Sequence, residues 1–258
     1  MKKKGALFEG ILQLRTQITA TAMPEPIELT IDGKKVRADS DQTILEIAEE
    51  QGIIIPTLCF VKELSQVGAC RLCLVEVQGI PRLLPACSTT AADGMKVRTD
   101  TARLRKHRKM ILELLFAERN HVCSVCVSNG RCELQSMAQD MGVTNTRFRY
   151  RYEPYGVDAT HPRFMYDANR CILCTRCVRV CSEVEGAHTW DVQGRGIQST
   201  LTVDLASDWG MSDTCTSCGK CVHVCPTGAL FEKGRATGEM NKRRDVLPRL
   251  ADLRSSLR

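Results

Sequence analysis

Apolar residues recur at helical spacing near the start of the chain, and this pattern predicts a short amphipathic helix over residues 6–18. The apolar positions that define it are Leu7, Ile11, Leu14 and Ile18. A helix of this kind packs either on its own domain or on another subunit. Two prolines within residues 21–26 predict that a linker follows it.

A strand pattern begins after this linker. Residues 27–31 are apolar at every second position, as expected of a strand with one buried face. The pair Asp32-Gly33 predicts a tight hairpin turn, because both residue types tolerate a positive φ angle. The returning strand is therefore expected at residues 35–38.

One helix and two more strands are predicted downstream of the hairpin. The helix covers residues 44–50, because the side chain of Asp41 or Thr43 can accept a hydrogen bond from its free N-terminal amides. Alternating patterns predict the strands at residues 74–77 and 96–98. A hairpin, a helix and further strands in this order indicate a β-grasp ferredoxin-like module.

The middle of the chain contains two predicted helices. Asp100 or Thr101 can cap the first, which runs to about Glu118, and the second covers residues 133–141. The apolar face of the first helix is expected to comprise Leu104, Ile111, Leu114 and Leu115. Residues 143–169 are polar and predict a loop.

A polar tail follows from Gly234 and carries a second short helical stripe. This stripe predicts a helix that is either a loose appendage or a contact for a partner, and it is formed by Val246, Leu250, Leu253 and Leu257. Of the net charge of +6, residues 233–258 carry +5 and residues 1–25 carry +2. Because no aromatic residues are interleaved with this charge, we do not expect nucleic-acid binding.

Cysteine is the residue type that distinguishes this chain of 258 residues. There are 15 cysteines and only 5 histidines, and an odd number of cysteines cannot close as internal disulfides alone. No run of 18 apolar residues predicts a membrane span, and the basic start of the chain lacks the features of a signal peptide. So many thiols in a chain without an export signal favour a cytoplasmic metal-binding protein.

The first group of cysteines matches a two-iron site. It comprises Cys59, Cys70, Cys73 and Cys87, and its centre reads Val-Gly-Ala-Cys-Arg-Leu-Cys. A two-iron cluster needs four thiolates from one loop and one more distant segment, and small neighbours let backbone amides approach the sulfur atoms. Zinc is the alternative metal, but its usual signature has two short cysteine pairs, and only one is found here.

Two similar runs of four cysteines lie in residues 170–232. The first run holds Cys171, Cys174, Cys177 and Cys181, and the second holds Cys215, Cys218, Cys221 and Cys225. In two-cluster ferredoxins the fourth cysteine of each run binds the other cluster. We therefore expect one [4Fe-4S] cluster on Cys171, Cys174, Cys177 and Cys225, and another on Cys181, Cys215, Cys218 and Cys221.

The remaining cysteines are Cys123, Cys126 and Cys132, one ligand short of a four-iron site. No other cysteine is unassigned, so a nearby imidazole is the natural fourth ligand, and His121 is the candidate by position. The alternatives are that His121 is a structural histidine and that Glu118 or solvent completes the site. A neutral histidine in place of a thiolate would raise the cluster potential.

Motifs for other chemistry are missing. Gly194-Arg195-Gly196 lacks the third glycine and the strand–helix context of a dinucleotide site, and there is no phosphate-binding loop. We therefore assign no catalytic residue, and we expect electrons to enter and leave through other subunits.

The order of these cysteine groups resembles the N-terminal part of the large iron–sulfur subunit of respiratory complex I and of the iron-only hydrogenases. Other matching stretches are residues 55–59, 67–73, 114–123 and 185–190. Because the chains of those families continue into a further domain, this shorter chain is more similar to the diaphorase iron–sulfur subunit of the bidirectional NAD-reducing [NiFe] hydrogenases. It departs from the pattern in one respect: only Val122 separates His121 from Cys123, where the families have three residues.

The resemblance implies an α+β fold with three cluster domains between two extensions. The expected boundaries are an N-terminal extension at 1–25, a β-grasp [2Fe-2S] domain at 26–100, a small [4Fe-4S] domain with one His and three Cys ligands at 101–141, a 2[4Fe-4S] ferredoxin-like domain at 142–233 and a C-terminal tail at 234–258. The implied cofactors are one [2Fe-2S] and three [4Fe-4S] clusters.

The resemblance also implies partners. A flavin- and NAD-binding diaphorase subunit would hold FMN and NAD, and hydrogenase small and large subunits would hold the Ni-Fe centre. The resemblance also allows a small thioredoxin-like [2Fe-2S] subunit as a further partner. The chain would then relay electrons for H2 + NAD+ = NADH + H+. The alternatives are the same relay in an NAD-dependent formate dehydrogenase or a complex I-like NADH:quinone oxidoreductase, a zinc-bound structural protein, and a redox-sensing nucleic-acid binder.

Overall fold

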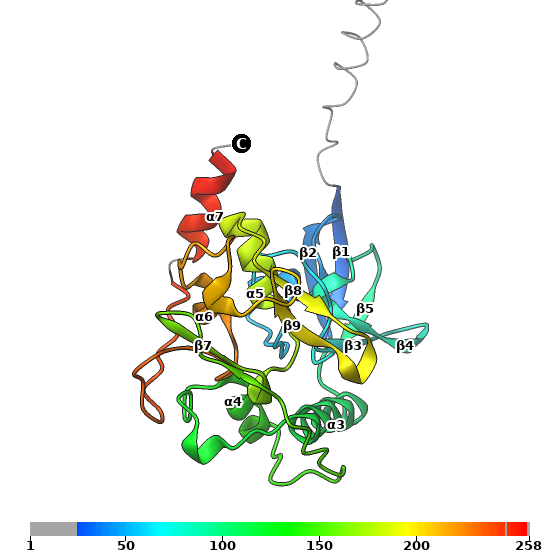
Figure 1. Cartoon of the computed structure of the whole chain (residues 1–258). Coiled ribbons are helices and arrows are strands. Elements are labelled where there is room, and N and C mark those ends of the chain that lie inside the picture. Colours follow the sequence, from blue (N-terminus) through cyan, green and yellow to red (C-terminus); the bar gives the residue numbers. More distant parts are fainter. Residues whose placement is uncertain (1–24, 246, 257–258) are drawn as a thin grey trace, which may run out of the picture.

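The computed structural model describes residues 25–245 and 247–256 (Figure 1). The helix predicted over residues 6–18 lies outside this part of the chain. Strands of the described residues form sheets of five, three and two strands, and helices accompany them, so the fold is α+β. No helix of the described residues is long and apolar enough to span a membrane.

The five-stranded sheet forms the N-terminal third of the described chain. Its strand order is β2-β1-β5-β3-β4, in which β1 and β5 are parallel and the other neighbours are antiparallel. The elements are β1 (Pro26–Ile31), β2 (Lys34–Asp39), α2 (Ile44–Glu50), β3 (Leu74–Val77), β4 (Ile80–Pro85) and β5 (Lys96–Arg98). Helix α2 buries its apolar side against the sheet through Ile44, Leu45 and Ile47. This is the predicted β-grasp arrangement.

Local side-chain chemistry explains how this sheet begins. Asp32 and Gly33 have φ angles of +48° and +87°, which gives the turn between β1 and β2 the twist that a two-residue hairpin requires. Of the two predicted caps for α2, Thr43 is the one used. Its hydroxyl accepts the amide of Glu46 at 3.3 Å, and the Glu46 carboxylate accepts the amide of Thr43 at 2.8 Å.

Strand β4 has no counterpart in the predicted elements. Prolines stand at its second and last positions, and proline interrupts the hydrogen-bond ladder of a central strand. The structure places β4 at the edge of the sheet, where it pairs with β3 alone. An edge position tolerates proline, because only one side of the strand needs its amides.

Helix α3 (Ala102–Glu118) begins after the cap Thr101 and lies beside α4 (Glu133–Asp140), below the sheet in Figure 1. The predicted apolar face of α3 was partly wrong. Leu114 is 44% exposed, whereas Leu112 and Arg108 are buried. Arg108 donates to the carbonyls of Leu72, Leu74 and Thr99 at 2.8–3.0 Å, so it joins the helix to the cysteine loop in front of β3.

The loop predicted over residues 143–169 was also partly wrong, because it contains two strands. These are β6 (Val157–Asp158) and β7 (Phe164–Asp167), and β7 also pairs with β10 (Leu230–Glu232). A hairpin of β8 (Trp190–Gln193) and β9 (Thr200–Val203) lies between the two cysteine runs. The helical segments of these runs are α5 (Arg176–Arg179), which continues into the π-helical turn η4 (Val180–Glu185), and α6 (Lys220–Val224). Single 3-10 turns are η1 (Ala86–Ser88), η2 (Cys123–Val125), η3 (Ala168–Arg170), η5 (Gly196–Gln198) and η6 (Trp209–Met211).

The C-terminal segment packs on the module that contains the two cysteine runs. Its helix α7 (Leu247–Ser256) confirms the predicted helical stripe, of which Val246 and Leu257 lie outside the described residues. Leu247 and Met240 are buried in the core of this module. The Lys242 ammonium donates to the carbonyls of Val222 and Leu230 at 2.9 and 2.7 Å. The segment is therefore part of the fold rather than a loose appendage.

Candidate functional site

The four thiols of the first cysteine group converge at one end of the β-grasp sheet. Cys59 lies in the loop after α2, Cys70 and Cys73 lie in the loop before β3, and Cys87 lies in η1 after β4. The sulfur atoms of Cys73 and Cys87 are 3.3 Å apart. The Cys70 thiol lowers the pKa of Cys59, and the Cys87 thiol lowers that of Cys73. The Cys87 thiol also lowers the pKa of Cys59, so the four sulfurs lie close together in one group.

Backbone amides surround this group. The amide of Leu58 donates to the Cys70 sulfur at 3.4 Å, and the amides of Ala69 and Cys70 add to the lowering of the Cys59 pKa that the Cys70 thiol mainly causes. Gly68 has a φ angle of +58°, and a Cβ atom there would lie 3.1 Å from the Ser88 hydroxyl. The small residue lets the loop close tightly, so the amides reach the sulfurs. These donors suit a cluster that becomes more negative on reduction.

The second group surrounds a small cavity that is lined by the loop joining α3 to α4, by the start of α4 and by Arg170, Thr227 and Gly228. Cys123, Cys126 and Cys132 line it together with His121, so the structure brings all four predicted residues to one site. Glu118, the alternative fourth ligand, is not among the lining residues, and its carboxylate faces Arg119 at 3.7 Å.

His121 has the properties of an imidazole that is available for a metal. Its Nε2 atom is buried without a hydrogen-bond partner among the described residues. Burial, with the nearby charges of Arg170 and Arg119, lowers its pKa to about 4, so the ring is neutral at physiological pH. A neutral ring nitrogen without a partner is the form in which histidine binds metals.

Gly228 forms the far wall of the same cavity. A Cβ atom at this position would lie 2.4 Å from the Cys126 sulfur, so no larger residue fits without a shift of the wall. The Ser128 hydroxyl also lines the cavity, is fully buried and has no partner among the described residues. Buried polar atoms normally have a partner, so the unpaired atoms of His121 and Ser128 indicate that this cavity receives a polar group.

The third group combines three cysteines of the first run with the last cysteine of the second. Burial raises the pKa of Cys177 well above its ordinary value, and repulsion from Cys174, Cys171, Cys225 and Cys221 adds to the rise. The amide of Leu173 donates to the Cys171 sulfur at 3.4 Å. Burying four thiolates together without counter-ions would be costly, and binding to iron would remove that cost.

The fourth group has the reciprocal composition. Cys181 lines one cavity together with Cys215, Cys218 and Cys221. Each run therefore contributes its last cysteine to the other group, which is the crossed grouping that the sequence predicts. That these thiols bind clusters in this grouping remains a prediction.

The two runs also repeat each other in backbone conformation. Leu173 and Thr175 have φ angles of +50° and +59°, and the equivalent residues Ser217 and Gly219 have +56° and +75°. Only Gly219 is a glycine, so the other three carry a side chain in a conformation that such residues rarely adopt. The strained turns wrap the first three cysteines of each run around a common centre, where functional sites often hold such strain.

The basic residues beside the cysteines are mostly paired rather than solvated. Arg170 forms an ion pair with Asp167, Lys220 pairs with Glu185, and Arg176 binds Glu133 through both of its terminal nitrogens at 3.0 and 3.1 Å. Glu133 is a residue that sequence reasoning missed, because nothing in its local pattern predicts a partner 43 residues away.

Zinc was the alternative metal for these cysteines. Among the described residues, no three His, Cys, Asp or Glu side chains are placed to hold a single metal ion.

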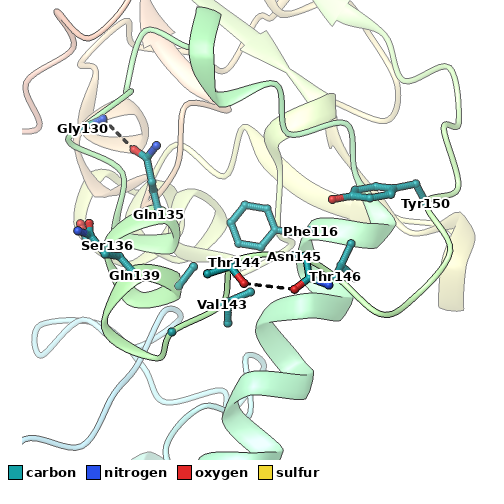
Figure 2. Close-up of a pocket in the computed structure, with 12 residues that line it drawn as sticks. Phe116, Gly130, Gln135, Ser136, Gln139, Val143, Thr144, Asn145, Thr146 and Tyr150 are labelled. Atoms are coloured by element: carbon teal, nitrogen blue, oxygen red, sulfur yellow. Dashed lines mark hydrogen bonds between the residues drawn. The ribbon is translucent and has the colours of Figure 1, made fainter.

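A separate pocket of about 530 Å³ opens between α4, the end of α3 and the segment that follows α4 (Figure 2). Phe116, Gln135 and Tyr150 are among its lining residues, and none of the lining side chains is an acid, a base or a thiol. Gln135 also lines the cavity of His121, and it accepts the amide of Gly130 at 2.8 Å. The polar side chains of this pocket are amides and hydroxyls, and its lining contains no carboxylate, imidazole or amine.

Three family models match successive parts of the chain. Residues 24–102 match a 2Fe-2S iron-sulfur cluster binding domain, residues 108–147 match the NADH-ubiquinone oxidoreductase-G iron-sulfur binding region, and residues 162–231 match the ferredoxin-like domain of NADH-quinone oxidoreductase subunit 3. The chain therefore contains a [2Fe-2S] domain followed by [4Fe-4S]-binding domains.

Whole-chain relatives agree with these matches. The chain is 41% identical over 210 residues to an NADH-quinone oxidoreductase subunit of Rhizobium meliloti, and this match covers 80% of this chain but only 24% of that relative's length. It is 33% identical to the gamma subunit of the NAD-reducing hydrogenase HoxS of Cupriavidus necator, covering 80% of this chain and 87% of that one. A chain in the crystal structure of an NAD+-reducing [NiFe]-hydrogenase in the H2-reduced state superposes with a TM-score of 0.77 at 37% identity, covering 81% of this chain and 88% of that chain.

Proposed function

This chain belongs to the family of the NAD-reducing hydrogenase gamma subunits, and on that premise we propose that it relays electrons through four iron–sulfur clusters. The observation that carries the proposal is that its 15 cysteines and His121 come together in space as four groups. Each cluster, when bound, would accept and pass on one electron at a time. The chain's own residues hold the clusters, set their spacing and exclude water.

The proposed ligands follow the four groups. A [2Fe-2S] cluster is assigned to Cys59, Cys70, Cys73 and Cys87, and three [4Fe-4S] clusters are assigned to His121, Cys123, Cys126 and Cys132, to Cys171, Cys174, Cys177 and Cys225, and to Cys181, Cys215, Cys218 and Cys221. The proposed domains are residues 26–100, 101–141 and 142–233, flanked by the two extensions.

Arg179 connects the first group with the third. It is buried, and its guanidinium donates to the carbonyl of Cys59 at 2.5 Å and to that of Cys174 at 3.2 Å. A third bond reaches the carbonyl of Ser65 at 2.6 Å. One side chain thus binds a cysteine of each group and keeps the two groups close together. A short distance between the two clusters supports electron transfer, because the transfer rate falls steeply with distance.

The second group also lies against the third. Arg170, Thr227 and Gly228 line the cavity of His121, and they are sequence neighbours of Cys171 and Cys225. The two runs exchange Cys181 and Cys225, so the third group also lies beside the fourth and is the common neighbour of the other three. We propose that it is the junction of the relay.

The proposed partners are a flavin- and NAD-binding diaphorase subunit and the small and large subunits of a [NiFe] hydrogenase, and the proposed location is the cytoplasm. FMN, NAD and the Ni-Fe centre would lie in those subunits. Two observations favour this over the formate dehydrogenase and complex I-like alternatives: the sequence relative and the solved structure that this chain covers almost fully are both from NAD-reducing hydrogenases.

The test is anaerobic purification of the tagged full chain from its own cells, with identification of the chains that accompany it. We expect diaphorase and [NiFe] hydrogenase subunits, and we expect both NADH and H2 to bleach the visible absorption of the complex. A molybdenum subunit in their place would contradict the hydrogenase assignment. Turnover of H2 or NADH by the isolated chain would contradict the relay itself.

A further inference from the structure

Both tryptophans of this chain lie at the same cysteine group. The sequence contains only two, Trp190 and Trp209. Both line the cavity that Cys181, Cys215, Cys218 and Cys221 surround, and they are 3% and 1% exposed. Trp190 begins β8 and Trp209 begins the turn η6, so the segment between the two cysteine runs delivers both rings to one site.

Trp209 already donates to a sulfur atom. Its indole Nε1 donates to the Cys215 sulfur at 3.3 Å. The Asp158 carboxylate accepts the backbone amide of Trp209 at 2.7 Å, and the rings of His161 and Phe164 pack 4.8 and 5.7 Å from the indole. The direction of the N–H bond is therefore set by the fold.

Trp190 points its indole toward the same site without an acceptor. Its Nε1 is buried and has no hydrogen-bond partner among the described residues. The ring meets Trp209 edge-on at 4.8 Å and Tyr166 edge-on at 5.5 Å, so it is fixed in place. A buried indole N–H normally has a partner, so an acceptor is expected in this cavity.

We propose that the indole N–H groups of Trp190 and Trp209 donate hydrogen bonds to the sulfur atoms of the [4Fe-4S] cluster at Cys181, Cys215, Cys218 and Cys221, and that they raise its reduction potential. This inference rests on the proposed function, because it requires that cluster. Reduction adds one negative charge to the cluster, and a donor to sulfur stabilises the more negative state. The tryptophans thereby make this cluster easier to reduce than its cysteines alone would.

The neighbouring group offers a matched comparison. Its buried donor is the Tyr166 hydroxyl, which also has no partner among the described residues and lies in the same core cluster as Cys171, Cys177 and Cys225. Replacing Tyr166 by phenylalanine should therefore act on the cluster of the third group. Replacing the tryptophans should act on the cluster of the fourth.

The experiment is an anaerobic redox titration of the full chain, followed by electron paramagnetic resonance, for the wild type, W190F, W209F and Y166F. We expect each Trp→Phe change to shift one [4Fe-4S] step to a more negative potential. Loss of one donor should change the reduced-to-oxidised ratio by about tenfold at a fixed potential, or about 59 mV for one electron. The Y166F change should shift a different step, and the [2Fe-2S] signal should stay unchanged.

A second measurement avoids any loss of packing in W209F. Expression with 5-fluorotryptophan replaces both indoles by a stronger N–H donor of nearly the same shape, and the same step should shift to a more positive potential. Intact iron and sulfide content with unchanged potentials in all these proteins would overturn this inference alone. A chain without iron and sulfide would overturn the proposed function together with it.

Discussion

At the scale of single residues, His121 has a shorter spacing to Cys123 than the family resemblance implies, and it still lies beside the cysteines of its group. Its ring lines the cavity of Cys123, Cys126 and Cys132, and burial with two arginine charges lowers its pKa to about 4. A neutral ring at this site leaves the proposed cluster with one negative charge fewer than four thiolates would.

The variant His121→Cys tests this role. A fourth thiolate adds a negative charge, so we expect the cluster to persist with a potential lower by on the order of 100 mV. Redox titration with electron paramagnetic resonance measures the change. Glu118→Gln is the control and should leave the titration as it is. A shift in the Glu118 variant with none in the histidine variant would assign the ligand to the carboxylate instead.

A variant at Gly228 tests how closely the cavity wall approaches the cysteines of the second group. An alanine there would place Cβ 2.4 Å from the Cys126 sulfur, so Gly228→Ala should prevent that thiol from reaching its cluster. We expect iron content to fall by about four atoms per chain. Gly156→Ala is the matched control, because its Cβ would meet nothing within 4 Å. Equal iron content in the two variants would show that the backbone at residue 228 shifts enough to accommodate the added methyl group.

Ligand residues were predictable where their spacing along the sequence carries the information. All four cysteine groups could be assembled from spacing and one rule about crossed runs, because cluster ligands recur at fixed intervals. The contacts of Arg108 and Glu133 could not be predicted, because their partners lie 36 and 43 residues away. A charged side chain on a helix looks solvated until the tertiary fold buries it.

At the scale of elements, the π-helical turn η4 places the last cysteine of the first run beside the first three cysteines of the second run. Cys181 lies in this turn, directly after α5, and lines the cavity of Cys215, Cys218 and Cys221. The variant Cys181→Ser should therefore damage the fourth group's cluster and spare the third group's. Spectroscopy of the two [4Fe-4S] signals checks this. Loss of the third group's cluster with an intact fourth would refute the crossed grouping.

The loop between β6 and β7 contains a histidine that predicts a pH dependence. Nδ1 of His161 accepts the amides of Arg163 and Phe164 at 3.1 Å each, which requires an unprotonated atom. Burial, aided by Arg163 and Lys233, lowers the His161 pKa below its ordinary value of 6.5. The unfolded chain then binds more protons below that pH, so this contribution to stability is present above about pH 6.5 and is lost as the pH falls toward the folded pKa.

Anaerobic melting temperatures at pH 7.5 and pH 5.5 measure this effect. In His161→Asn the amide oxygen can accept the same bonds without titrating. We expect the wild type to lose more stability than this variant between the two pH values. Equal losses would show that His161 does not contribute.

Strongly patterned elements were predictable, and short strands were not. The alternation of β1 and the cap of α2 are local, so the sequence alone predicts both. Strand β7 is different, because its ladder is completed by β10, more than 60 residues later. Strand β4 was not predicted because it contains prolines, which are tolerated there only because the strand lies at the edge of the sheet.

At the scale of the whole molecule, the four groups are held at fixed spacing by contacts between distant segments. Arg179 joins the loop of Cys59 to the first cysteine run, and the C-terminal segment binds the loop of the second group through the amide of Gly238, which donates to the Cys126 carbonyl at 3.1 Å. In Figure 1 the sheet, the α3–α4 pair and the two-run module lie against one another. A relay requires such a rigid arrangement.

The central claim is that this chain holds four clusters, and the most direct measurement is the iron and acid-labile sulfide content of the anaerobically purified full chain. One two-iron and three four-iron clusters predict about 14 iron atoms and about 14 sulfides per chain. A colourless protein that contains zinc and no sulfide would contradict the account.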